Sequence, residues 1–156
     1  DWSLVEQIID VNVKGAAATL SAAARGMVRR HSGHLVGISS ISTARPLPGN
    51  AAYGASKAFL DGFLGSLRLD LRLVGVDVTC INPGFMASEM SAANPYPMPF
   101  LVSADEAAQR IGGAITRRVR RYTFPAPLAL AMRVASWTPE ALFELVAPGL
   151  TAPRRR

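Results

Sequence analysis

Two short apolar segments, separated by one long helical pattern, constrain the fold of this chain more than any other feature. The segments are HLVGISS (34–40) and VDVTCIN (76–82), and runs of this kind between turn residues are typical of buried strands. Residues 52–73 between them are helical in pattern, with apolar side chains every four positions at Phe59, Phe63, Leu67 and Leu71, and Gly75 ends the helix. The order strand, helix, strand predicts a βαβ crossover and therefore a parallel sheet.

Further helices are expected around this unit. The pattern predicts one helix over residues 3–30 and another over 103–119, opened by the capping boxes SLVE (3–6) and SADE (103–106). Residues 122–150 are expected to hold a short strand and two short helices. Two or three strands are too few for a complete doubly wound sheet. We therefore expect an α/β fold that forms the C-terminal half of a doubly wound parallel sheet with flanking helices.

Composition favours one folded domain over residues 1–156, since 49% of the residues are hydrophobic and 18% are charged. No apolar run reaches the roughly 18–20 residues of a membrane-spanning helix, and no cleavable leader opens the sequence, so the expected location is the cytoplasm. The single cysteine, Cys80, lies in an apolar segment and is interpreted as a buried structural thiol. His31 and His34 have no acidic or cysteine ligands nearby in sequence, so no metal is expected.

The formal net charge of +6 comes from arginines grouped in RGMVRR, TRRVRR and the terminal PRRR. Such groups can bind phosphate or anionic lipid, although a solvated face and tail is the favoured interpretation. Aromatic side chains do not alternate with these arginines as single-strand binders require, so nucleic acid is not an expected partner.

The stretch AAYGASKAFLDGF places Tyr53 and Lys57 four residues apart, on one face of the predicted helix. A nearby ammonium favours the phenolate and lowers the pKa of a tyrosine, which makes it a better acid–base catalyst near neutral pH. Ser40 ends the first predicted strand, where open α/β sheets hold their ligands. Its hydroxyl, beside that of Tyr53, would hold a carbonyl or alcohol oxygen; the alternative is a strand-end serine that caps the turn.

Two further segments carry polar groups or close-approach residues. After the second predicted strand, Pro83 and Gly84 allow a flat ligand close to the backbone, and Ser88 offers a hydroxyl four residues later. Asn12 lies in the middle of the first predicted helix, where its amide is unfavourable on propensity. It is expected either at the surface or against a specific internal partner.

Together the segments DVNVKG, HLVGISSIS, PGNAAYGASKAFLDGF and VTCINPGFMAS resemble the short-chain dehydrogenase/reductase family, in order and at matching separations over about residues 3–90. The resemblance implies a Rossmann-like sheet and hydride transfer between NAD or NADP and a carbonyl or hydroxyl group. The family's catalytic tetrad falls on Asn12, Ser40, Tyr53 and Lys57. In this resemblance Tyr53 is the general acid/base, Ser40 orients the substrate oxygen, Lys57 lowers the tyrosine pKa and holds the nicotinamide ribose, and Asn12 anchors a water that relays protons. Pro83, Gly84 and Ser88 match the segment that lies against the nicotinamide.

The chain departs from the family pattern in three places. Thr43 stands where the family often has glycine, and Ser88 stands where it usually has threonine. The Gly-rich phosphate turn T-G-x-x-x-G-x-G does not occur, and Gly112 and Gly113 lie in a predicted helix without a preceding strand. The resemblance therefore implies that the N-terminal, cofactor-binding half lies outside these residues, with the side chain that selects NAD or NADP. We expect the 156 residues alone to be inactive and to bind the cofactor poorly.

Two alternatives concern partners. The helices over residues 3–30 and 52–73 resemble those of the family's dimer or tetramer interface, so the chain is also interpreted as a non-catalytic, self-associating module. Residues 91–156 are expected to hold a substrate loop, whose Met, Phe and Pro content suggests an apolar alcohol or carbonyl substrate, and a C-terminal helical region. That region is interpreted as a lid over the substrate pocket, with contact to a membrane surface as the alternative.

Overall fold

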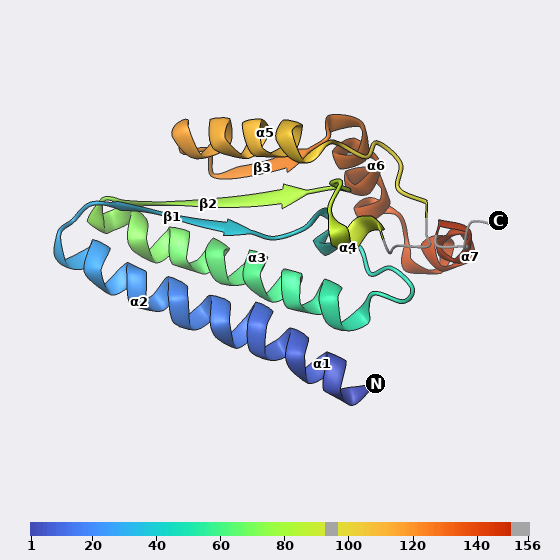
Figure 1. Ribbon diagram of the computed structural model, residues 1–156, viewed down its shortest axis with the longest axis horizontal. Coiled ribbons are helices and arrows are strands. Elements are labelled where there is room, and N and C mark those ends of the chain that lie inside the picture. The colour runs from blue at the N-terminus through green and yellow to red at the C-terminus, as the bar shows by residue number, and fades with distance from the viewer. Residues whose placement is uncertain (93–96, 151–156) are drawn as a thin grey trace.

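The computed structural model describes residues 1–92 and 97–150, which form a three-stranded sheet with helices on both faces (Figure 1). The strands are parallel in the order β1-β2-β3, so the predicted α/β fold with a parallel sheet is confirmed. In chain order the elements are α1 (Trp2–Ile9), the π-helix η1 (Asp10–Gly15), α2 (Ala16–Arg29), β1 (Gly33–Ile38), the short 3-10 helix η2 (Ile41–Thr43), α3 (Ala51–Leu71), the 3-10 helix η3 (Arg72–Val74), β2 (Val76–Pro83), α4 (Glu89–Ala92), α5 (Ala104–Thr116), β3 (Arg121–Phe124), α6 (Ala126–Trp137) and α7 (Glu140–Leu150).

The β1–α3–β2 unit is the predicted crossover, with strands of the expected composition. Gly33 of β1 lies opposite Val76 of β2, and the register continues to Ile38 and Ile81. Every residue of β2 except Asp77 is buried, which explains why its sequence reads as an apolar run. Gly75 ends the helical segment with a φ of 74°, a conformation that glycine adopts without steric cost.

Two hydrophobic cores lie on opposite faces of the sheet. Helices α2 and α3 cover one face of the sheet, and α5 covers the other (Figure 1). Side chains of α2, α3, β1 and β2 form the first core, around the fully buried Leu64 and Cys80. The second core joins β2 and β3 to α5 around Ile81, Ala114 and Phe124. Cys80 is therefore the buried thiol predicted from its apolar segment.

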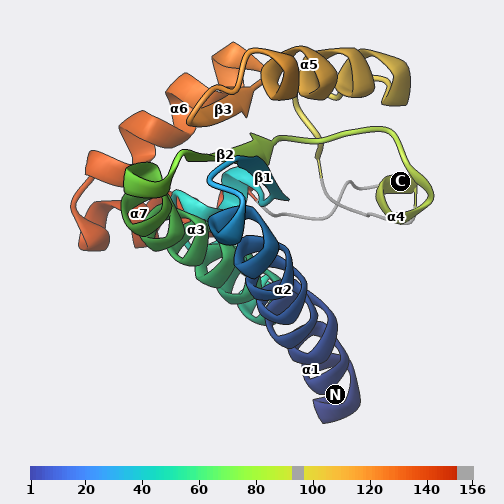
Figure 2. The ribbon, with the colours of Figure 1, turned by 90° about the vertical axis from the view of Figure 1, so that its left-hand side faces the viewer.

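The long N-terminal helix packs along α3 and is exposed at its start. Figure 2 shows α1 and α2 as one continuous rod; α2 covers the sheet, α1 contacts α3, and none of the α1 residues is buried. The cap differs from the prediction: the Asp1 side chain accepts from the Ser3 N–H at 3.1 Å, so Asp1, and not Ser3, is the N-cap. Ser3 already lies inside the first turn. The second predicted cap is confirmed, since Ser103 accepts from the Glu106 N–H at 3.1 Å.

The buried face of α3 lies next to the face predicted from apolar side chains at every fourth position, and does not coincide with it. Ser56, Leu60 and Leu64 are buried against the sheet, with Leu71 at the end of the helix. Phe59 and Phe63 instead stack on each other on a more exposed side, with ring centroids 5.6 Å apart. The spacing predicted the helix, but the position of the sheet decided which side was buried.

Candidate functional site

Three of the predicted catalytic residues meet where β1 ends and α3 begins. Ser40 is the N-cap of η2, directly after β1, and Tyr53 and Lys57 project from the first two turns of α3. All three line one cavity of about 530 Å³. Pro83, Gly84 and Ser88 line it as well, together with Ile38, Ser39, Met86 and Glu89. Of the predicted site residues, the described structure leaves only Asn12 outside the lining.

The Ser40 hydroxyl can donate a hydrogen bond into this cavity. It accepts hydrogen bonds from the Ser42 N–H at 3.1 Å and from the Ser42 hydroxyl at 3.0 Å. A hydroxyl has one proton and two lone pairs, so two incoming donors leave its own proton to be donated. Burial raises the pKa of Tyr53, and a hydrogen bond with Ser40 opposes that rise. The two hydroxyls are therefore neighbours, and the phenol is protonated at neutral pH.

Lys57 lies beside the tyrosine ring rather than at its hydroxyl. Its ammonium is 5.6 Å from the ring centroid of Tyr53 and donates to the Ile38 carbonyl oxygen at 3.1 Å. Burial lowers the pKa of Lys57 itself. Burial and the hydrogen bond with Ser40 are the causes of the Tyr53 pKa shift here, so the lowering of the tyrosine pKa by Lys57 stays a prediction.

Asn12 reaches the site through a serine that the sequence pattern did not single out. The Asn12 amide nitrogen donates to the Ser56 hydroxyl oxygen at 3.0 Å, and the Ser56 hydroxyl donates to the Tyr53 carbonyl oxygen at 2.7 Å. Asn12 lies in η1, and π-helical turns inside α-helices are frequent at functional sites. Of the two interpretations of this amide, an internal partner is the one observed. The sequence signal that could have identified Ser56 is its position in mid-helix, where a serine often bonds a carbonyl oxygen in the preceding turn. In the structure Ser56 is buried and makes this bond.

The segment after β2 closes the other side of the cavity. The Gly84 N–H donates to the Phe124 carbonyl oxygen at 2.7 Å, and a Cβ at Gly84 would lie 2.8 Å from Leu128 of α6. A side chain at this position would displace Leu128, so the end of β2 and α6 pack closely at Gly84. Ser88 is exposed and exchanges hydrogen bonds with Ser91 in the first turn of α4. The substrate loop predicted within residues 91–156 includes residues 93–96, which lie outside the described residues.

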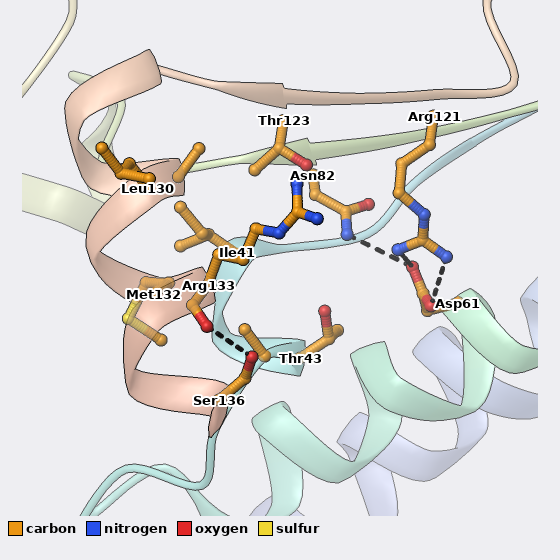
Figure 3. Close-up of a pocket in the computed structure, with 12 residues that line it drawn as sticks. Ile41, Thr43, Asp61, Asn82, Arg121, Thr123, Leu130, Met132, Arg133 and Ser136 are labelled. Carbon is orange, nitrogen blue, oxygen red and sulfur yellow. Dashed lines mark hydrogen bonds and ion pairs between the residues drawn. The ribbon is translucent and has the colours of Figure 1, made fainter. Parts of the chain in front are cut away.

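A larger cavity of about 590 Å³ lies between α3, β3 and α6, and Asp61, Asn82 and Arg121 at one end of it are bonded to one another (Figure 3). Asp61 accepts from two Arg121 nitrogens at 2.7 and 2.9 Å and from the Asn82 amide at 3.2 Å. Burial raises the pKa of Asp61, but the hydrogen bonds from Arg121, Cys80 and Asn82 outweigh it, so the pKa lies below its ordinary value. Burial beside Asp61 raises the pKa of Cys80 to about 12, so this thiol stays protonated. Saturated groups of this kind hold β3 against α3 and are not poised for chemistry.

A family model described as short chain dehydrogenase matches residues 1–97. This chain belongs to the short-chain dehydrogenase family. An uncharacterized oxidoreductase of Myxococcus xanthus is 52% identical over 146 residues, covering 94% of this chain and 58% of the relative. The NADP-dependent 3-hydroxy acid dehydrogenase YdfG of Escherichia coli K12 is 42% identical over 86 residues, covering 55% of this chain and 34% of that protein. The chain thus spans little more than half the length of the first of these relatives and a third of the second.

Solved structures of the family have the same fold. A short chain dehydrogenase from Burkholderia cenocepacia, solved in complex with NADP, superposes with a TM-score of 0.80 at 22% identity, covering 94% of this chain and 60% of that one. Acetoin dehydrogenase YohF from Salmonella typhimurium superposes with a TM-score of 0.68 at 26% identity, covering 84% and 57%. These likenesses place the three strands and their helices in a Rossmann-like arrangement.

Proposed function

We propose that this chain carries the acid–base side of an NAD(P)-dependent oxidoreductase, which transfers a hydride between the nicotinamide and a carbonyl or hydroxyl carbon of a small molecule. The observation that carries the proposal is the single cavity lined by Ser40, Tyr53 and Lys57 together with the Pro83–Gly84 turn. A neutral hydroxyl donor, a half-buried phenol and a half-buried ammonium in one cavity are the groups that reversible carbonyl reduction requires.

The residues present suit the nicotinamide end of the cofactor. An ammonium has three donors, and among the described residues Lys57 uses one, toward the Ile38 carbonyl, so it can also bind the ribose hydroxyls. Pro83 and Gly84 offer a flat backbone surface beside it. When bound, the cofactor supplies the hydride donor or acceptor. NADP is the first cofactor to test, because the E. coli relative is named NADP-dependent and the B. cenocepacia structure contains NADP.

The chain's own residues provide the proton and the orientation. Ser40 donates to the substrate oxygen, and Tyr53, beside it, gives its proton to that oxygen during reduction or takes it during oxidation. Lys57 stabilises the phenolate that reduction leaves behind, once its ammonium turns from the Ile38 carbonyl toward the hydroxyl. Asn12 holds the first turns of α3 through Ser56 and, by family resemblance, anchors the water that returns a proton to Lys57. Ile38 and Met86 in the lining favour an apolar substrate.

The test is the Tyr53→Phe variant in the complete protein that contains this chain. Turnover with NADPH and a panel of apolar ketones should fall by about 10²–10⁴, because the general acid is lost. Tyr122→Phe is the matched control, since Tyr122 lies on β3 outside the cavity and its variant should keep its rate. Full activity of Tyr53→Phe would overturn the proposed role.

Self-association is a second candidate function, favoured by the exposed apolar side chains of the N-terminal helix. Trp2, Leu4 and Val11 are each more than half exposed along α1 and η1. A second copy that packed its own helices against this face would bury them. Sedimentation should then show a dimer or tetramer at micromolar concentration, and Trp2→Ser with Val11→Ser should yield a monomer. A monomeric unsubstituted chain would exclude this role.

A further inference from the structure

The turn that carries Ser40 is held to the sheet at its start. Ser39, the residue before it, donates from its N–H to the Ile81 carbonyl oxygen at 2.7 Å and from its hydroxyl to the Lys57 carbonyl oxygen at 2.9 Å. Both bonds fix the backbone where β1 ends. They leave the position of the following residues, 40–44, to other contacts, and we call these residues the serine turn.

The serine turn is held together by bonds among its own residues. The Thr43 N–H and hydroxyl donate to the Ser40 carbonyl oxygen at 3.3 and 3.0 Å, and the Ala44 N–H donates to the Ile41 carbonyl oxygen at 3.1 Å. With the two bonds from Ser42 to the Ser40 hydroxyl, these contacts make the turn one compact unit. A displacement of its far end therefore moves the Ser40 hydroxyl as well.

Arg45, directly after the serine turn, joins that far end to the C-terminal helices. Its guanidinium donates to the carbonyl oxygen of Ala135 at 2.8 Å and to that of Thr138, both at the C-terminal end of α6. It also lies 4.9 Å from the ring centroid of Phe143, a buried side chain of α7. Among the described residues, Arg45 makes the only hydrogen bonds from residues 41–49 to a distant part of the chain.

The chemistry of this contact suits an arginine. The last carbonyl groups of a helix lack donors within the helix and carry the negative end of its dipole, so a cation is stabilised there. A planar guanidinium can donate to two carbonyl oxygens and lie against an aromatic ring, whereas an ammonium is a single point charge. No described carboxylate forms an ion pair with Arg45, so the helix end and the ring are the groups that hold it.

Helices α6 and α7 therefore reach Ser40 from outside the cavity. Among the described residues, neither helix contributes to the lining of the cavity that contains Ser40 and Tyr53. The lid that the sequence predicts over this cavity stays a prediction, and so does contact with a membrane surface. Within the described ranges no helix is long and apolar enough to cross a membrane.

We propose that Arg45 is a positioning residue for Ser40: by joining the serine turn to α6 and α7, it holds the Ser40 hydroxyl where it can donate to the substrate oxygen. This inference rests on the proposed function, because it assigns Arg45 a part in that same hydrogen bond. Arg45 does not line the cavity itself. Its loss should therefore slow the reaction and leave the binding of the cofactor unchanged.

The test is Arg45→Met in the complete protein that contains this chain, assayed with NADPH and the apolar ketone that it reduces fastest. Methionine keeps an apolar stem and lacks the guanidinium. The kcat should fall about 10–100-fold, because small displacements of a group that orients the substrate have effects of this size. The KM for NADPH should stay within about twofold, since no cofactor contact is removed.

Two further variants provide the comparison. Arg45→Lys keeps the cation but can reach one carbonyl oxygen only, so it should recover part of the rate. Arg72→Met is the matched control, because Arg72 is an exposed arginine of η3, before the start of β2 and at the other end of that strand from the site. Its variant should keep both kcat and KM.

A double-mutant cycle with Ser40→Ala shows whether Arg45 acts through Ser40. Ser40→Ala alone should lower kcat about 100-fold, because a donor to the substrate oxygen is lost. In that background Arg45→Met should lower kcat by less than about twofold more, since the group that it positions is gone. A general loss of folded protein would instead lower kcat by the same factor in both backgrounds, and thermal unfolding of each variant measures that loss directly.

Two results would overturn the inference: an unchanged kcat in Arg45→Met, and an equal fall in the two backgrounds. Either result, with Ser40→Ala still impaired, leaves the proposed function intact. Full activity of both Ser40→Ala and Tyr53→Phe would overturn the proposed function itself. Arg45→Lys keeps a cation at the helix end, so the same cycle is measured with it if Arg45→Met does not fold.

Discussion

Helix α3 carries two polar clusters about two turns apart, and they are built in opposite ways. Around Asp61, a carboxylate, a guanidinium, an amide and a thiol satisfy one another over distances of 2.7 to 3.2 Å. Around Tyr53 and Lys57, burial disfavours the charged forms, raising the pKa of the tyrosine and lowering that of the lysine. The first cluster lines the larger cavity and the second the smaller one.

This difference distinguishes a cluster that stabilises the fold from a cluster that can bind a ligand. Polar groups that already have partners gain nothing from a ligand and hold the sheet edge in place. Groups held half-buried with few partners destabilise the free protein slightly and gain their partners when a ligand arrives. The size of a cavity is therefore a poorer guide to the reacting site than the pairing of the groups that line it.

The largest stability effect is expected where the pairing is most complete. Asp61→Ala leaves Arg121 and Asn82 without their acceptor, and the Asp61 side chain is only 20% exposed. The free energy of unfolding should fall by about 2–3 kcal/mol, measured by urea denaturation. Asp70→Ala, an exposed position later on the same helix, should change it by less than about 0.5 kcal/mol. Equal effects of the two changes would show that the hydrogen bonds around Asp61 add no stability.

The same carboxylate should make stability depend on acid pH. The pKa of Asp61 is below its ordinary value in the folded chain, so the unfolded chain binds its proton first as the pH falls. The stability from this pair is complete above about pH 4 and is lost as the pH falls through the folded pKa. The free energy of unfolding, measured at pH 7 and at acid pH, should differ less between the natural chain and Asp61→Asn at acid pH. A constant difference would exclude Asp61 as the titrating group.

A smaller loss of stability is expected where α3, the helix that carries both clusters, is bonded to η1. Ser56→Ala removes the acceptor of the Asn12 amide and should cost about 1–1.5 kcal/mol of unfolding free energy. In the complete protein it should also lower turnover, since Ser56 joins Asn12 to the turn that carries Tyr53. Ser66→Ala, exposed on the same helix, is the control and should leave both quantities unchanged.

The smallest expected effect has the opposite sign. Lys57→Met removes a half-buried ammonium whose burial disfavours its charge, so the free energy of unfolding should rise by about 0.5 kcal/mol while turnover of the complete protein is lost. Lys14→Met is the control, because Lys14 forms an exposed pair with Asp10 and should contribute about 0.5 kcal/mol or less. A marked loss of stability in Lys57→Met would show that Lys57 is structural.

Sequence patterns predicted most elements because short-range periodicity and turn chemistry decide where helices and strands begin and end. The β1–α3–β2 unit, the Ser103 cap and the strand with two helices after residue 121 are all observed. The first cap was displaced to Asp1, since two nearby polar side chains can serve and spacing alone does not choose between them. The family resemblance over residues 3–90 was confirmed by the match over residues 1–97.

The gathering of Ser40, Tyr53, Pro83 and Gly84 in one cavity follows from the sequence, because the ends of parallel strands and the start of the next helix share one edge of the sheet. Two features required the tertiary structure. Asp61 meets Arg121 across 60 residues, and Asn12 meets Ser56 across 44. Local spacing encodes which side chains share a face. Only the packing of β3 and α6 decides what that face meets, because contacts between distant segments depend on the positions of every element between them.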